Sequence, residues 1–140
     1  RNIEPLKSSL YNQFMAHIGT YAKDTKIKIN KDSIDKKEKY GLILTPELWD
    51  TNLQISVFFE GKNYTNLYVG IEFPSEFERK DEFRNKFKAK GFKESDWGIW
   101  KYSTNKDWAD DAEIWKSVEE GEEYQEIINV INEIIEIEKS

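Results

Sequence analysis

Two runs of alternating apolar residues, separated by a turn-forming segment, constrain the fold of this chain more than any other feature. Apolar residues occupy every second position of both runs, namely Leu53, Ile55, Val57 and Phe59 in the first and Leu67, Val69, Ile71 and Phe73 in the second. A period of two is typical of a strand with one buried face. The intervening Gly61-Lys62-Asn63 has the composition of a tight turn. We therefore expect an antiparallel hairpin that turns at residues 61–64.

The start of the chain has a helical period instead. Apolar residues recur there at three- and four-residue spacing, namely Ile3, Leu6, Leu10, Phe14 and Ile18. This spacing predicts an amphipathic helix over residues 3–22. Residues 23–39 are rich in Lys and Asp, and residues 26–29 alternate like a short exposed strand, so we expect an edge strand followed by a loop. The apolar run 40–44 predicts a further strand.

A second helix is predicted after the hairpin. Ser75 followed by Glu78 matches a capping box, and Gly91 is a typical residue beyond a helix C-terminus. These signals predict a helix over residues 76–90, and its buried side would carry Phe77, Phe83 and Phe87.

The C-terminal part of the sequence predicts one more strand and then helices. Residues 97–102 are an aromatic strand candidate. Apolar residues from Trp108 onward follow a helical period, and Gly121 marks a plausible break between two helices. Acidic residues occupy the outward positions of these helices.

Together these elements predict an α+β fold: an N-terminal helix, a small, mainly antiparallel sheet with a central hairpin, and C-terminal helices. A chain of 140 residues has the usual size of one domain. We expect a single domain over residues 1–140, with the helix 3–22, the Lys-rich edge and loop 23–39 and an α+β body 40–140. Because the sequence opens with Arg1, we interpret it as part of a longer chain.

Composition excludes several classes of protein. The twenty aromatic residues rule out disorder throughout, and no run approaches the roughly 20 apolar residues of a membrane helix. The absence of Cys excludes disulfide scaffolds, thiolate metal sites and cysteine nucleophiles. The single histidine, His17, lies inside the first predicted helix, where a structural role is expected. We predict a cytoplasmic chain with no membrane partner, no metal and no cofactor.

The net charge of −6 hides a gradient along the chain. Residues 106–140 carry three Lys and twelve Asp or Glu, whereas the predicted helix 76–90 is basic. Its cations and a nearby tryptophan are the candidate nucleic-acid contacts: Arg79, Lys80, Arg84, Lys86, Lys88, Lys90 and Trp100. Cations beside aromatic rings suit phosphate contact and base stacking. The alternative is that the cations solvate a helix and that Trp100 belongs to the core.

One triplet suggests enzymatic chemistry. Glu60-Gly61-Lys62 is an E-x-K sequence leaving a strand, as in nucleases that hold Mg²⁺ with two carboxylates. The nearest upstream carboxylate, Asp50, would lie roughly 30 Å away along an extended strand. Glu72 is predicted opposite Leu53, at the far end of the hairpin from Glu60. The sequence therefore predicts no catalytic residue, and a nuclease using Glu60 and Lys62 is the alternative.

A family resemblance gives the main functional pointer. It rests on Tyr40-Gly41, Trp49, the strand 53–59, Glu60-Gly61-Lys62-Asn63-Tyr64 and Leu67-Tyr68-Val69-Gly70-Ile71, followed by Trp97, Trp100 and Trp108. This run resembles the C-terminal region of uncharacterised bacterial proteins related to the PD-(D/E)XK nuclease superfamily, in which a nuclease-like half often precedes such a region. The resemblance implies a non-catalytic accessory or interaction domain of a larger nuclease-like bacterial protein. Its partners would be the upstream nuclease-like region, another protein or weakly held nucleic acid.

Overall fold

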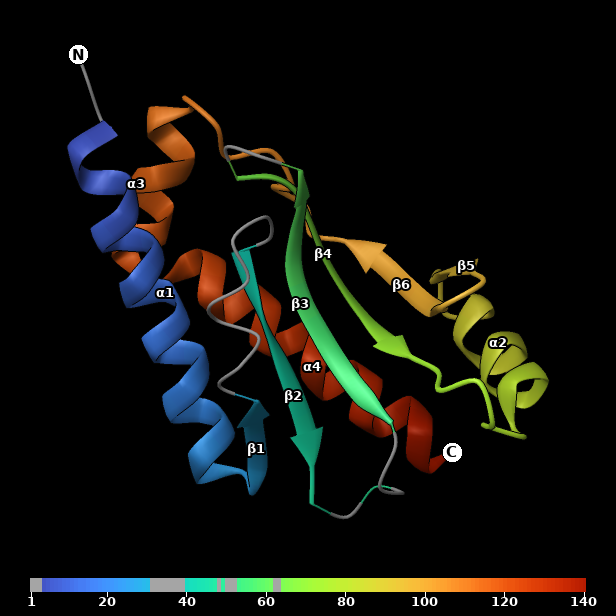
Figure 1. The fold of residues 1–140 in the computed structure, drawn as a ribbon. Helices are drawn as coiled ribbons and strands as arrows, with labels where there is room; N and C mark the ends of the chain where they lie inside the picture. The colour runs from blue at the N-terminus through green and yellow to red at the C-terminus, as the bar shows by residue number, and fades with distance from the viewer. Residues whose placement is uncertain (1–3, 31–39, 48, 50–52, 62–63) are drawn as a thin grey trace.

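The computed structural model describes residues 4–30, 40–47, 49, 53–61 and 64–140. In chain order the elements are α1 (Glu4–Asp24), β1 (Ile27–Asn30), β2 (Tyr40–Pro46), β3 (Gln54–Gly61), β4 (Thr65–Glu72), α2 (Lys80–Lys88), β5 (Lys93–Ser95), β6 (Gly98–Tyr102), α3 (Ala112–Glu120) and α4 (Glu122–Lys139). Within these ranges the strands form one six-stranded antiparallel sheet in the order β1-β2-β3-β4-β6-β5 (Figure 1). The predicted α+β class is confirmed.

The central hairpin is the predicted one. Phe59 pairs with Leu67, Val57 with Val69, and Gly61 with Thr65 across the turn. Glu72 pairs with Gln54 rather than with Leu53, one position from the predicted register. It still lies at the far end of the hairpin from Glu60, as expected.

The flanking strands agree with the sequence except for β5. Strand β1 is the expected edge strand, while residues 31–39 of the predicted loop lie outside the described residues. Strand β2 continues through Pro46, two residues past its predicted end, and the aromatic strand candidate 97–102 forms β6. The three-residue β5 was not predicted, because Lys93-Glu94-Ser95 has no apolar residue to reveal a strand.

Helix α2 begins later than its predicted start at residue 76. Ser75 Oγ donates to the carboxylate of Glu76, so the predicted capping box with Glu78 does not form, and Arg79 is the N-cap. The predicted role of Gly91 beyond the helix C-terminus is confirmed, although α2 ends at Lys88, two residues before its predicted last residue. Gly91 has a φ of 91°, and the hydrogen bonds Phe92 N–Phe87 O and Gly91 N–Lys88 O form a Schellman motif.

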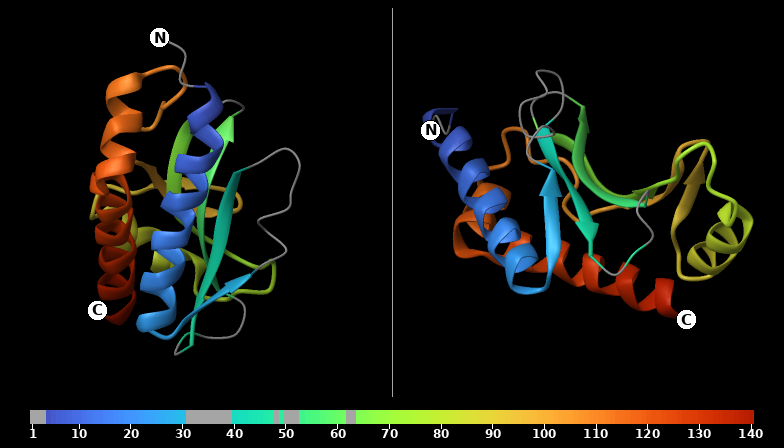
Figure 2. Two further views of the ribbon diagram at one scale, coloured as in Figure 1. Left: turned by 90° about the vertical axis from the view of Figure 1, so that its left-hand side faces the viewer. Right: turned by 60° about the horizontal axis from the view of Figure 1, so that its bottom comes forward.

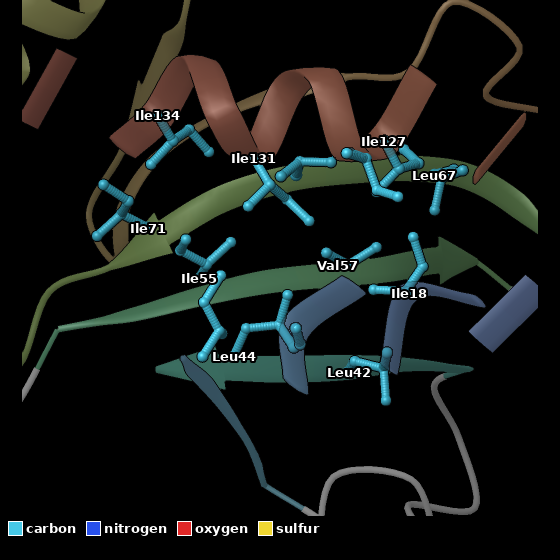
Figure 3. Packing of buried hydrophobic residues seen from close by; sticks show 14 of the residues in the cluster. Ile18, Leu42, Leu44, Ile55, Val57, Leu67, Ile71, Ile127, Ile131 and Ile134 are labelled. Atoms are coloured by element: carbon cyan, nitrogen blue, oxygen red, sulfur yellow. The ribbon is translucent and has the colours of Figure 1, made fainter. Parts of the chain in front are cut away.

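The helices α1, α3 and α4 lie on one side of the sheet (Figure 2). Ile18 of α1 and Ile131 of α4 pack on inward residues of the strands, including Leu44, Val57 and Ile71 (Figure 3). Helix α2 joins the same core through Phe83 and Phe87. Among the described residues no helix lies on the opposite face of the sheet, and none has the length and apolar character needed to cross a membrane.

The C-terminal helices are divided where the sequence suggested. Gly121 ends α3 and precedes α4 with a φ of 89°, a left-handed conformation that favours glycine. The Asp111 side chain caps α3 by accepting hydrogen bonds from the backbone N–H groups of Glu113 and Ile114. Trp108 lies before α3, fully buried against Phe14 and Phe59.

Candidate functional site

The basic side chains predicted to contact nucleic acid belong to α2 and its flanks. Arg79 Nη2 lies 2.6 Å from Glu82 Oε2. Lys80 Nζ donates to the backbone carbonyl of Ser75, and Lys86 Nζ to that of Glu138 at the end of α4. These cations are therefore already engaged in local contacts.

Two further cations converge on one carboxylate. Lys88 Nζ lies 3.1 Å and Arg84 Nε 3.6 Å from the carboxylate oxygens of Glu94 on β5. Arg84 also donates to the Ser95 carbonyl. Lys90 is exposed and lines a shallow groove against the end of α4. Because a compensated cation attracts phosphate less, the nucleic-acid role of α2 stays a prediction with little electrostatic support.

The structure separates Trp100 from the α2 cations. Helix α2 packs on the core side of the sheet, whereas alternation along β6 sends Ile99 into that core and Trp100 to the opposite face. The Trp100 indole donates to Ser95 Oγ at 2.8 Å, which fixes the orientation of the ring. The predicted set is thus divided between two faces of the sheet.

Trp100 belongs to a surface that we call the aromatic face. It consists of Phe58, Tyr68, Trp97, Trp100 and Tyr102, which come from β3, β4, the β5–β6 turn and β6. Ring centroids lie 6.3 Å apart for Phe58–Tyr68, 6.4 Å for Tyr68–Trp100 and 4.8 Å for Trp100–Tyr102. Trp97 lies 5.7 Å from Tyr68. The rings form one connected array across three adjacent strands.

Exposure rises along this array. Phe58 and Tyr68 are buried, Trp100 and Tyr102 are half-buried, and Trp97 is 37% exposed. Its accessible end therefore lies at β6 and the β5–β6 turn. Any ligand of the face would meet Trp97, Trp100 and Tyr102 first.

Small residues make room for the rings. A Cβ at Gly41 would lie 2.2 Å from Phe58 Cδ1, and a Cβ at Gly70 would lie 2.7 Å from Trp100 Cβ. The lack of a side chain at Gly41 and Gly70 thus leaves the space that Phe58 and Trp100 occupy on the neighbouring strands. Ser56 lies between Ile43 and Gly70 in the same row of the sheet. Its hydroxyl is fully buried and, in the described structure, has no hydrogen-bond partner.

Tyr68 holds its proton firmly. The pKa of its hydroxyl is raised to about 12, mainly by burial and in smaller part by the carboxylates of Glu72 and Glu60. Both effects disfavour the phenolate, because it would be poorly solvated and repelled by two anions. Tyr68 is therefore a neutral ring with a hydroxyl donor at neutral pH and is poorly suited to act as a base.

Two lysines lie over the exposed rings. Lys93 Nζ lies 5.4 Å from the Trp100 ring centroid and 5.5 Å from that of Tyr102. Lys106 Nζ lies 4.7 Å from the Tyr102 ring and also 3.3 Å from Asp107 Oδ2. Within the described part of the chain Lys93 makes no ion pair, so its charge is uncompensated. The accessible end of the aromatic face combines open rings with one available cation.

The alternative nuclease site gains no support. Glu60 is exposed at the end of β3, and Glu72 lies at the other end of the hairpin. Lys62 and Asp50 lie outside the described residues. Among the residues that are described, no group of three or more His, Cys, Asp or Glu side chains could hold a metal ion.

Sequence reasoning missed most of the aromatic face. Phe58 and Tyr68 occupy outward positions of two alternating strands, where polar residues are the rule. Their outward position was the available signal for a second apolar face. Comparison of the chain with protein-family models, curated proteins and solved structures finds no match, so function must be argued from the site itself.

Proposed function

We propose that this chain is a non-catalytic accessory domain of a larger, nuclease-like bacterial protein, and that it guides nucleic acid over the aromatic face. The resemblance carried by residues 40–71 and by Trp97, Trp100 and Trp108 motivates the nuclease-like context, and the first of these segments includes the central hairpin. The absence of Cys is compatible with a cytoplasmic setting. The observation that carries the proposal is the accessible group of Trp97, Trp100 and Tyr102 beside the uncompensated charge of Lys93.

The chemistry of this surface matches that of a nucleic acid. Aromatic side chains offer faces on which bases stack, and a lysine without an ion pair can neutralise a phosphate. The cations of α2 are less available to bind phosphate, because most of them already contact carboxylates or carbonyl groups.

The test is a binding titration that compares two single-charge variants. A fluorescently labelled nucleic acid is titrated with the chain at about 50 mM and about 200 mM salt, with single-stranded and duplex forms in separate arms. Lys93→Gln should weaken binding and reduce the salt slope by about one unit, because one phosphate contact is lost. Lys116→Gln is the matched control, since Lys116 is exposed on α3 in the opposite layer.

The control should bind like the unchanged chain. Absence of binding to either form at the lower salt concentration would overturn the proposal. Equal losses of affinity in the two variants would also overturn it. Lys93 would then contribute to binding only through the net charge of the protein and not through a local contact.

A further inference from the structure

The accessible rings are held ready for a flat ligand. The hydrogen bond from the Trp100 indole to Ser95 Oγ and the 4.8 Å contact with Tyr102 fix the indole on the sheet. Trp97 extends the ring array through its contact with Tyr68. A ring fixed in this way loses little conformational freedom when a base stacks on it.

Lys93 lies over these rings but does not block access to them. Its ammonium group lies within 5.5 Å of the Trp100 and Tyr102 ring centroids, but the side chain itself is exposed. A cation–π contact at an exposed position is weaker than the stacking of a nucleobase on an aromatic side chain. A base can therefore replace the ammonium group, which is then free to contact a phosphate of the same strand.

Resting on the proposed function, we infer that the ligand of the aromatic face is single-stranded nucleic acid, with one base stacked on Trp100 and Lys93 moved from that ring to an adjacent phosphate. A duplex is a poorer ligand because its bases are already stacked and paired, so a base must first be extruded. The geometry requires no particular base, since every base has a π-face.

The test compares strand forms and ring variants in direct competition. A labelled single strand of about twelve nucleotides is displaced by unlabelled single-stranded DNA, RNA of the same sequence, or the matching duplex. Both single strands should compete better than the duplex, and the stronger of the two identifies the preferred sugar. Trp100→Leu should weaken single-strand binding about fivefold or more, whereas Trp100→Phe should retain most of the affinity because it keeps a ring.

Tyr124→Leu is the matched control. Tyr124 is a half-buried ring on α4, in the opposite layer, where it stacks on His17. Its loss should leave single-strand binding unchanged. Equal competition by duplex and single strand, together with wild-type affinity in Trp100→Leu, would overturn the inference. The proposed function would survive that result if Lys93→Gln still weakened binding more than Lys116→Gln does. It would fail only if no nucleic acid bound, or if Lys93→Gln and Lys116→Gln weakened binding equally.

A second readout avoids dependence on the leucine variant. The indole N–H resonance of Trp100, identified by its loss in Trp100→Phe, should shift when the single strand is added. The indole of Trp108 is fully buried and donates to the Asn105 carbonyl, so its resonance should stay in place. Binding without a shift at Trp100 would overturn the inference.

Discussion

The hydroxyl of Ser56 offers a sharp test of the structure, because removing it should stabilise the protein. Ser56 is fully buried in the middle of the sheet, and its Oγ has no hydrogen-bond partner in the described structure. A buried polar group without a partner loses its hydrogen bonds to water and forms no hydrogen bond within the protein to replace them. Replacement by Ala removes the polar atom and leaves the backbone pairing of β3 intact.

The magnitude follows from two opposing contributions. An unpartnered buried hydroxyl costs about 1–3 kcal/mol. Removing one oxygen leaves a void of about 10–15 Å³, which costs about 0.3 kcal/mol at about 24 cal/mol per Å³. Ser56→Ala should therefore raise the free energy of unfolding by about 1–2 kcal/mol. For a chain of this length that corresponds to a rise in Tm of about 3–8 °C.

Ser103 supplies the matched control. It is also a buried serine, but its Oγ donates to Glu126 Oε1 at 2.8 Å. Ser103→Ala should lower the free energy of unfolding by about 1.5–3 kcal/mol, because a hydrogen bond to a charged group is lost. Urea denaturation followed by circular dichroism measures both changes. A loss of stability in Ser56→Ala similar to that of Ser103→Ala would show that the Ser56 hydroxyl has a partner and would refute the reasoning.

Three further predictions concern the fold. Ile71→Ala should lower the free energy of unfolding by about 2–5 kcal/mol, measured by urea denaturation, because Ile71 is fully buried beneath α4. Gly121→Ala should cost about 1 kcal/mol or more in the same assay, since Gly121 has a φ of 89° and a Cβ would lie 2.8 Å from Tyr124 Cε1. Burial raises the pKa of Glu123 above 4.5, so the folded state binds a proton more tightly than the unfolded state and stability falls as pH rises from about 4.5 through the folded pKa. Glu123→Gln should remove that fall and raise the denaturation midpoint at about pH 7, and a midpoint with unchanged pH dependence would contradict this assignment.

Sequence periodicity was sufficient for the elements that bury one clear face. The hairpin of β3 and β4 and the helix α1 follow directly from spacings of two and of three or four apolar residues. The start of α2 could not be found in this way, because the Ser75 hydroxyl contacts Glu76 instead of capping the helix. Strand β5 exists only through its pairing with β6, a tertiary contact that its own three residues do not encode.

The candidate site was harder to predict for a related reason. An aromatic residue in a strand segment fits either face of a sheet, and Trp100 was open to both interpretations until the register with Gly70 was known. The partner of its ring, Lys93, was one of several cations in a basic segment. What distinguishes it is its position over the Trp100 and Tyr102 rings without an ion pair in the described part of the chain, which depends on the side chains around it and not on its position in the sequence.

The charge distribution decides how the salt dependence of binding should be interpreted. Residues 106–140 carry twelve of the 27 acidic residues against only three Lys, and most of this segment forms α3 and α4, in the layer opposite the aromatic face. At low salt these carboxylates repel a polyanion while Lys93 attracts it, and added salt screens both effects within a Debye length of about 8 Å under physiological conditions. The total salt slope therefore combines a favourable and an unfavourable part, and a shallow slope does not imply the absence of a phosphate contact. The difference in slope between the unchanged chain and Lys93→Gln isolates that contact, because the repulsion from α3 and α4 is common to both proteins.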